Sequence, residues 1–172
     1  IYDTNGKFVR SIENENKKSI TSVAWNPSKN VLVVLSDKIR IFDTDGKLLQ
    51  SIKHRPEEVL LLCVAWHPSG KFFATGDYGD AQDKSMLQFW NAQGELLQQH
   101  IVSKAEVRNL CWNQKGSRLA TASDALRIWD TDANLLYEGL SEDYLWGVSW
   151  NGKGKRIVTS SMEQHVVIWD SK

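Results

Sequence analysis

One loop of this sequence groups side chains that could bind a metal ion. Asp77, Asp80 and Asp83 stand three residues apart in a stretch that also contains Gly79. Calcium prefers several oxygen ligands, so this loop suggests a calcium site. The spacing departs from the EF-hand pattern, in which acidic residues alternate and a glutamate closes the loop. A solvated extension of a hairpin over residues 77–84 explains the same residues, and we predict no metal and no cofactor.

The other residues of catalytic type do not form a recognisable constellation. Cys63 and Cys111 have no metal-ligand spacing and no histidine at a matching offset, which indicates small core residues. His67 follows a tryptophan at a place where asparagine stands elsewhere, so we expect it to make turn hydrogen bonds. The sequence has no glycine-rich phosphate loop, nucleophile elbow or zinc signature. The chain is therefore predicted not to be an enzyme.

Composition and charge favour a globular domain. Of 172 residues 41% are hydrophobic, and Lys plus Arg and Asp plus Glu both number 21. This balance leaves no excess of positive charge for binding nucleic acid or an anionic membrane, so neither is predicted as a partner. Apolar runs such as 31–35 and 59–66 are far shorter than the roughly 18 residues of a membrane-spanning helix. Two cysteines without a disulfide framework favour a reducing compartment, and we expect a cytoplasmic location.

Two short motifs return along the chain in step with each other. The first ends in tryptophan and occupies residues 22–25, 63–66, 109–112 and 147–150. The second is an aromatic residue followed by Asp or Asn, at residues 2–3, 42–43, 90–91, 129–130 and 169–170. Turn residues follow each motif, and the segments between them alternate with a period of two. Each period is therefore predicted to hold four short strands.

These motifs resemble the WD40 family, whose repeats of roughly 40 residues form four-stranded propeller blades. The resemblance covers essentially the entire chain and implies an all-β fold, a β-propeller of four-stranded antiparallel blades. We divide the chain into four repeats, at residues 1–43, 44–91, 92–130 and 131–172, each closing on its aromatic–Asp or aromatic–Asn pair. Rings of this family usually have more blades. The chain is thus expected to be a partial propeller, completed by further blades of a longer chain or by a second copy in an eight-blade ring.

Alignment of the repeats on their first tryptophan separates core positions from variable ones. Residues two and five positions before it are apolar in every repeat: Val23, Val64, Leu110 and Val148, and Ile20, Leu61, Val107 and Leu145. These offsets cannot share one face of a regular strand, because side chains alternate. A β-bulge between them would restore the facing.

The bulge is expected to turn the residues four and six positions before the tryptophan toward one rim of the ring. In the WD40 family this rim is the usual surface for protein partners. Carried over to this sequence, the resemblance gives as candidate partner-binding residues Arg108, Tyr144, Trp146, Leu62, Glu106 and Thr21. Alternatively, Tyr144, Trp146, Leu60 and Leu62 simply pack between blades.

The predicted function is therefore a non-enzymatic scaffold that binds a protein or peptide at the rim of the propeller channel. Two alternatives remain open. The blades are purely architectural parts of a larger protein, or the loop from Asp77 to Asp83 serves a metal-binding or enzymatic propeller.

Overall fold

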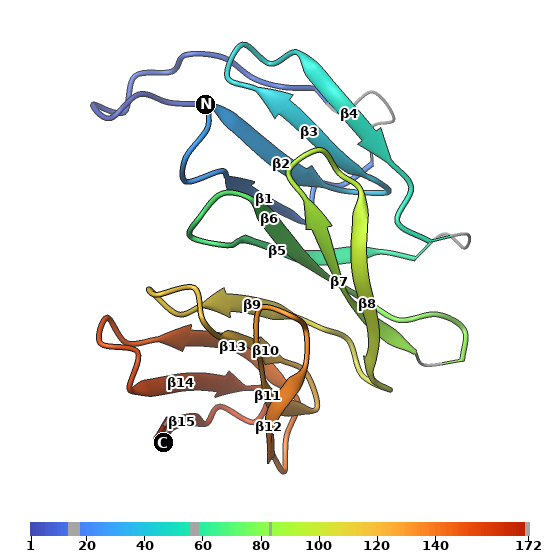
Figure 1. The fold of residues 1–172 in the computed structure, drawn as a ribbon, viewed down its shortest axis with the longest axis vertical. Helices are drawn as coiled ribbons and strands as arrows, with labels where there is room; N and C mark the ends of the chain where they lie inside the picture. Colours follow the sequence, from blue (N-terminus) through green and yellow to red (C-terminus); the bar gives the residue numbers. More distant parts are fainter. Residues whose placement is uncertain (14–17, 56–58, 83, 171–172) are drawn as a thin grey trace.

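The computed structural model describes residues 1–13, 18–55, 59–82 and 84–170. Within them fifteen strands form four antiparallel sheets, and neighbours in sequence are neighbours in each sheet (Figure 1). The first sheet contains β1 (Ser22–Trp25), β2 (Val31–Leu35), β3 (Ile39–Asp43) and β4 (Leu48–Ile52). The second contains β5 (Leu61–Trp66), β6 (Phe72–Asp77), β7 (Ser85–Asn91) and β8 (Leu96–Ser103). The third contains β9 (Asn109–Trp112), β10 (Leu119–Ala122), β11 (Ala125–Trp129) and β12 (Leu135–Leu140). The fourth has three strands, β13 (Leu145–Trp150), β14 (Arg156–Ser161) and β15 (Val166–Asp170).

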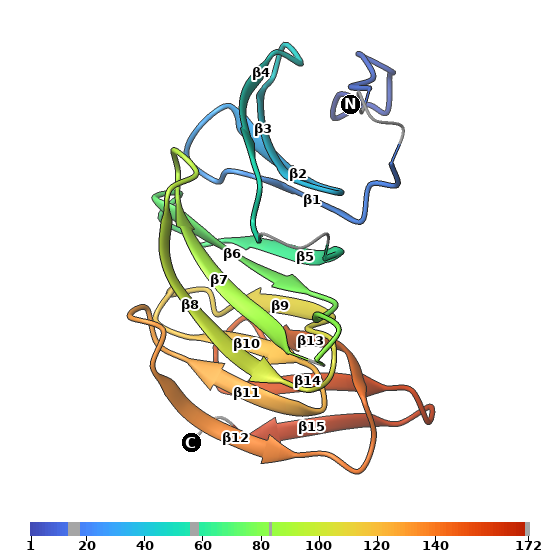
Figure 2. The same cartoon turned by 90° about the vertical axis from the view of Figure 1, so that its right-hand side faces the viewer.

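The four sheets are consecutive blades of a propeller, as the repeats predict. Their first strands β1, β5, β9 and β13 lie innermost and contact one another in that order. The blades follow each other along an open arc, with the first and fourth blades at its two ends (Figures 1 and 2). The repeat divisions at residues 43, 91 and 130 each fall between the third and fourth strands of a blade. None of the described residues forms a helix long and apolar enough to cross a membrane.

In the second, third and fourth blades the tryptophan that ends the inner strand bonds to the preceding blade. The Trp66 indole Nε1 donates a hydrogen bond to the carbonyl oxygen of Ala24 at 3.2 Å. Trp112 and Trp150 donate in the same way to the carbonyl oxygens of Ala65 and Cys111, at 3.4 and 2.9 Å. The tryptophan is thus recurrent because one side chain both fills the space between blades and satisfies a backbone acceptor.

The aromatic–Asp motif closes the turn between the third and fourth strands. Asp43 Oδ1 accepts hydrogen bonds from the backbone N–H groups of Asp45 and Lys47, both at 2.9 Å. Asp3, Asn91 and Asp130 accept the same pair of bonds in their own turns. A short acceptor side chain that bonds its own backbone two residues on is typical of such turns.

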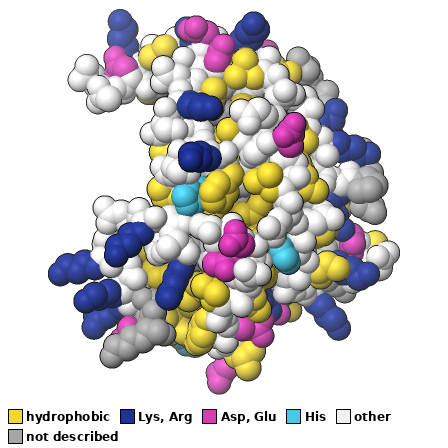
Figure 3. Space-filling model, in the orientation of Figure 1, with side chains coloured by type: hydrophobic (Ala, Val, Ile, Leu, Met, Phe, Trp, Pro, Cys, Tyr) yellow, Lys and Arg dark blue, Asp and Glu magenta, His cyan; other side chains and the backbone are white. Residues whose placement is uncertain are grey.

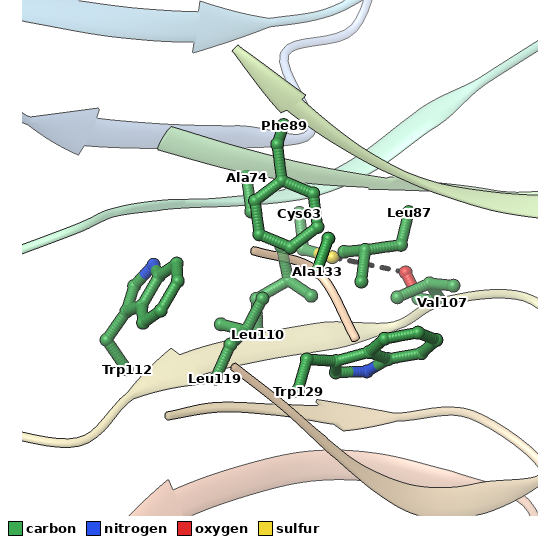
Figure 4. Close-up of a cluster of buried hydrophobic side chains, with 10 residues drawn as sticks. All are labelled: Cys63, Ala74, Leu87, Phe89, Val107, Leu110, Trp112, Leu119, Trp129 and Ala133. Atoms are coloured by element: carbon green, nitrogen blue, oxygen red, sulfur yellow. Dashed lines mark hydrogen bonds between the residues drawn. The ribbon is translucent and has the colours of Figure 1, made fainter. Parts of the chain in front are cut away.

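The core between the second and third blades is the largest cluster of buried apolar side chains (Figure 4). Val107 lies so close to Gly76 that a Cβ there would stand 2.5 Å from its Cγ1. The Cys63 thiol donates to the Val107 carbonyl oxygen at 3.1 Å, and burial raises the pKa of this thiol far above its ordinary range. Cys63 is therefore an inert core residue, as its offset in the repeat predicts.

Outside the first blade the predicted core positions are buried, apart from Val64, which is partly buried. Leu61, Val107 and Leu145 are fully buried, because a preceding blade covers each of them. Their equivalent Ile20 is 48% exposed, and Val23 is 61% exposed. The prediction is wrong for these two residues because the described part of the chain places no sheet against that flank. Trp25 is 50% exposed for the same reason, whereas its counterpart Trp66 is 7% exposed.

The N-terminal segment does not complete the fourth blade. The chain could have closed on itself by pairing residues 8–12 with residues 166–169. Instead Tyr2 and Phe8 form an isolated antiparallel bridge, and the segment lies against the first blade, where Arg10 forms an ion pair with Asp45. Ile12 then stands 3.4 Å from the position of a Cβ on Gly46, as Ile52 adjoins the same position on Gly94. Residues 1–13 thus occupy the place that the outer strands of a preceding blade would take.

Candidate functional site

The inner strands of the second and fourth blades begin with a bulge, which we predicted from the offsets of the core residues. In β5 and β13 the register slips at Leu62 and Trp146, each of which stands as an extra residue opposite its partner strand. Thr21 and Arg108 lie at the equivalent positions, where their backbone N–H groups donate to Leu35 and Ala122 at 3.0 and 2.9 Å. We call the edge of the arc that carries these four residues the bulge rim.

Four of the six candidate residues line one cleft of about 320 Å³ on the bulge rim, between the second, third and fourth blades. They are Glu106 and Arg108, just before β9, and Tyr144 and Trp146, at the start of β13. Tyr144 is 57% exposed and Trp146 is 50% exposed, so neither is packed between blades. The alternative of a buried structural role is wrong for these two residues.

The Arg108 guanidinium organises the cleft. Its Cζ atom lies 4.6 Å from the ring centroid of Trp146, which is a cation–π geometry. The same group forms an ion pair with Glu106. Stacking and pairing hold Arg108 and the indole in one arrangement, while Trp146 stays half exposed.

A second cleft of about 460 Å³ adjoins the first and shares Tyr144 and Met162 with it. Its lining contains four carboxylates: Asp124, Glu142, Asp143 and Glu163. Burial acts to raise the pKa of Asp124, but hydrogen bonds from Arg127, Ser103 and Ser123 outweigh it and lower that pKa. Asp143 accepts from Ser161 and contacts the His165 Nδ1 at 3.1 Å. The bulge rim therefore joins an aromatic cleft to an acidic one.

The other two candidates, Thr21 and Leu62, do not line this cleft. Thr21 lies in the first blade, where its hydroxyl donates to the Leu35 carbonyl oxygen at 3.3 Å. Leu62 is half-buried in the second blade, while its neighbour Leu60 is 45% exposed. Repeat alignment gives equal weight to all four blades, but among the described residues at these positions those of the third and fourth blades bring aromatic and charged side chains together.

Tyr78, Lys104 and Met162 also line the cleft, and repeat alignment missed them. They lie in connections between strands, outside the positions that recur with the tryptophan motif. Tyr78 is 54% exposed and Met162 is 61% exposed. The one signal in the sequence is the presence of large apolar residues within turn segments.

In the loop considered for calcium, Asp77 and Asp80 bind the side chain of an arginine from another segment, Arg55. The Arg55 guanidinium bonds Asp77 at 3.1 Å and Asp80 at 2.6 Å, and it also donates to the carbonyl oxygen of Lys84 at 3.0 Å. Burial raises the pKa of Asp77, against the opposing effect of Met86, Arg55 and Gly79. Asp83 lies outside the described residues, among which no group of three potential ligands is found. The two described carboxylates are engaged by a cation of the protein itself, so the geometry does not support the calcium hypothesis.

Two family models match this chain. A family model described as "Eukaryotic translation initiation factor eIF2A" matches residues 1–145, and one described as "WD domain, G-beta repeat" matches residues 136–170. The chain belongs to the WD-repeat family. The longer match spans more than half of the chain, so residues 1–145 also belong to the eukaryotic translation initiation factor eIF2A family.

Two curated relatives match nearly the whole chain. The F-box-like/WD repeat-containing protein TBL1X of Homo sapiens is 30% identical over 178 residues, which are 93% of this chain and 31% of that protein. Protein HIR1 of Cryptococcus neoformans is 26% identical over 193 residues, which are 93% of this chain and 22% of that protein. The chain thus spans less than a third of the length of these relatives. WD-repeat families generally serve as scaffolds for protein interaction and not as enzymes.

Proposed function

We propose that this WD-repeat chain binds a segment of a protein partner in the cleft on the bulge rim of its third and fourth blades. The observation that carries the proposal is the stack of Arg108 on a half-exposed Trp146, with Tyr144 beside it. The blades do not need these side chains for packing, since the equivalent residue in the first blade is Thr21.

The residue types favour a protein partner. Trp, Tyr and Arg dominate binding hot spots because each covers a large area and keeps a polar group for a hydrogen bond. Here the pairing with Glu106 fixes the Arg108 guanidinium before any partner arrives. A preorganised surface loses less side-chain entropy on binding, which raises affinity.

The acidic cleft indicates what the partner segment contains. A side chain seated against Trp146 would place its neighbours near Glu142, Asp143 and Glu163, which line the adjoining cleft. These carboxylates favour Lys or Arg in the segment, and charge complementarity of this kind fixes register and speeds association. The proposed ligand is therefore a peptide with an apolar or aromatic residue next to one or more basic residues.

Selection of displayed random peptides on the WD-repeat protein tests the proposal. We expect enrichment of peptides with an aromatic residue beside Lys or Arg. The triple variant Arg108→Ala, Tyr144→Ala, Trp146→Ala should weaken them by about thirtyfold or more, because a single hot-spot truncation costs about 2 kcal/mol. The matched control is Tyr137→Ala, which removes a tyrosine that is 48% exposed on β12. Peptides that bind the triple variant and the parent equally would refute the proposal.

We further propose that other blades complete the ring on the two open flanks. Trp25 has an exposed indole on one flank, and Ile168 is 67% exposed on the other. The length of the relatives favours further blades of the same polypeptide over a second copy in an eight-blade ring. Light scattering on the 172-residue chain distinguishes the two, since a second copy gives a species near twice 19.6 kDa.

The names of the related proteins point to different cellular processes. One family description names a translation initiation factor, whereas one relative is named for an F-box-like region. The proposal therefore specifies the class of partner and the surface that binds it. With Cys63 and Cys111 both free, we propose a reducing, cytoplasmic location.

A further inference from the structure

The opposite ends of the same inner strands carry a basic groove. Hairpin turns follow the tryptophan that ends each inner strand, and we call the edge formed by these turns, at residues 26–30, 67–71, 113–118 and 151–155, the turn rim. Between its third and fourth turns lies a groove of about 580 Å³. Four cationic side chains line it: Lys115, Arg118, Lys153 and Lys155. Lys and Arg side chains gather on this side of the molecule, where the hairpins β9–β10 and β13–β14 point (Figure 3).

Hydrogen bonds within these two turns hold the backbone from which the cationic side chains extend. Asn151 Oδ1 accepts from the backbone N–H groups of Lys155 and Arg156 at 2.9 and 3.2 Å, and its carbonyl oxygen accepts from Gly154 at 2.8 Å. Asn113 makes the equivalent bonds to Arg118 and Gly116, at 3.3 and 2.9 Å. Both turns therefore have a fixed backbone, and the spacing between the lysine stems is set by the fold.

The described lining of the groove carries positive charge from Lys115, Lys153 and Lys155 together with Arg118. Among the described residues that line it there is no carboxylate, and the remaining lining is formed by Asn113, Gln114, Ser117, Gly152 and Gly154. Asp170 faces Arg156 across the sheet and lies outside the lining. The chain as a whole has no net charge, so this excess of cations is a local feature of two turns.

We propose that this groove binds an acidic segment of a protein, independently of the cleft on the bulge rim. Lysine ammonium groups at the edge of a groove attract carboxylates, and such rim charges act mainly on association rate and salt dependence. Single-stranded nucleic acid is disfavoured, because its binding sites combine cations with aromatic platforms and no aromatic side chain lines this groove. Duplex nucleic acid needs a wide basic face, and a chain with no net charge and two basic turns does not present one.

Fluorescence anisotropy with a labelled peptide of alternating Glu and Ser tests this proposal on the full protein. The groove variant Lys115→Glu, Lys153→Glu, Lys155→Glu should weaken binding by about tenfold or more. The matched control Lys29→Glu, Lys47→Glu, Lys71→Glu makes the same change in charge on exposed lysines of the first two blades. It should bind the peptide as the parent does. The affinity of the parent should fall as salt is added, since screening weakens exposed charges.

Two further measurements keep the outcome decisive. A single Lys153→Gln variant, which removes one charge from an exposed turn, should give an intermediate loss of affinity. A peptide with Gln in place of Glu should not bind. The proposal is overturned if the groove and control variants lose affinity equally, if the parent does not bind the acidic peptide, or if RNA of equal charge binds more tightly than the peptide.

Discussion

The two rims of the third and fourth blades lie at opposite ends of the same strands, yet they are built in different ways. On the bulge rim an extra residue, Trp146 in β13, leaves the sheet, and its neighbours supply aromatic and charged side chains. On the turn rim the backbone itself is fixed by Asn113 and Asn151, and lysines extend from it. At a bulge, the extra residue is not paired in the sheet, so its side chain can differ between repeats. In the turns, the backbone is the same in the third and fourth blades, and the side chains that extend from it supply the charge.

The rims also differ in what stabilises them. The bulge rim of the second blade contains the buried ion pair of Arg55 with Asp77, whose backbone carbonyl oxygen accepts from the Val107 N–H of the third blade at 2.9 Å. The turn rim depends on neutral hydrogen bonds and on glycines with positive φ, such as Gly116 and Gly154. We therefore expect the stability of the bulge rim to depend on pH through Asp77.

A large effect is expected on the bulge rim from Arg55→Met. This change leaves Asp77, which is 1% exposed, without its guanidinium, and loss of one partner of a buried pair costs about 3 kcal/mol at neutral pH. Burial already raises the pKa of Asp77, and loss of the cation raises it further.

The loss of unfolding free energy in Arg55→Met should become smaller as the pH falls. Above the folded-state pKa of Asp77 neither state binds the proton, so the full penalty applies. As the pH falls through that raised pKa toward about 3.9, the ordinary aspartate value, the folded state binds a proton that the unfolded state does not. The deficit of the variant should therefore shrink between neutral and acid pH in denaturant titrations followed by tryptophan fluorescence. Adding Asp77→Asn should abolish this trend, and a deficit independent of pH would contradict the assignment.

An intermediate effect is expected on the turn rim from Gly116→Ala. Gly116 has a φ of 73°, and a Cβ there would stand 2.4 Å from His67 Nε2, which contacts the Gly116 carbonyl oxygen at 2.8 Å. The variant should lose about 1–2 kcal/mol of unfolding free energy, because the Cβ strains a left-handed backbone and meets the His67 ring. The control is Gly152→Ala, because nothing lies within 4 Å of its Cβ position. Equal losses in the two variants would show that the turn rim is not constrained as the structure indicates.

Repeat spacing was enough to predict the fold, the inner strands, the bulge and the hydrogen bonds of the turns. His67 does make turn hydrogen bonds with Ser69, and its ring extends to the next blade at Gly116. A spacing argument treats each repeat alike, so it could not predict that Ile20 and Val23 lie on an open flank.

The contents of the candidate site were harder to predict than its position. Tyr78 and Met162 reach the cleft from connecting segments, whose paths are set by tertiary contacts and not by periodicity. The guanidinium of Arg55, which bonds Asp77 and Asp80, comes from the connection between β4 and β5, outside the loop that suggested calcium. Neither the cleft lining nor the Arg55 ion pairs could be predicted, because the residues that meet are far apart in the sequence.

The smallest expected effect on stability separates a binding residue from a core residue. Trp146 and Trp112 are both in inner strands or their bulges, but Trp112 is 8% exposed and donates to the Ala65 carbonyl oxygen. Trp112→Ala should lower the unfolding free energy by about 3 kcal/mol or more, as is usual for a buried aromatic residue. Trp146→Ala removes only a half-exposed ring and its contact with Arg108, which is worth about 1 kcal/mol or less. Thermal unfolding of the two variants measures this difference. A loss at Trp146 as large as that at Trp112 would make its role architectural, because the fold and not a partner would then require the exposed indole.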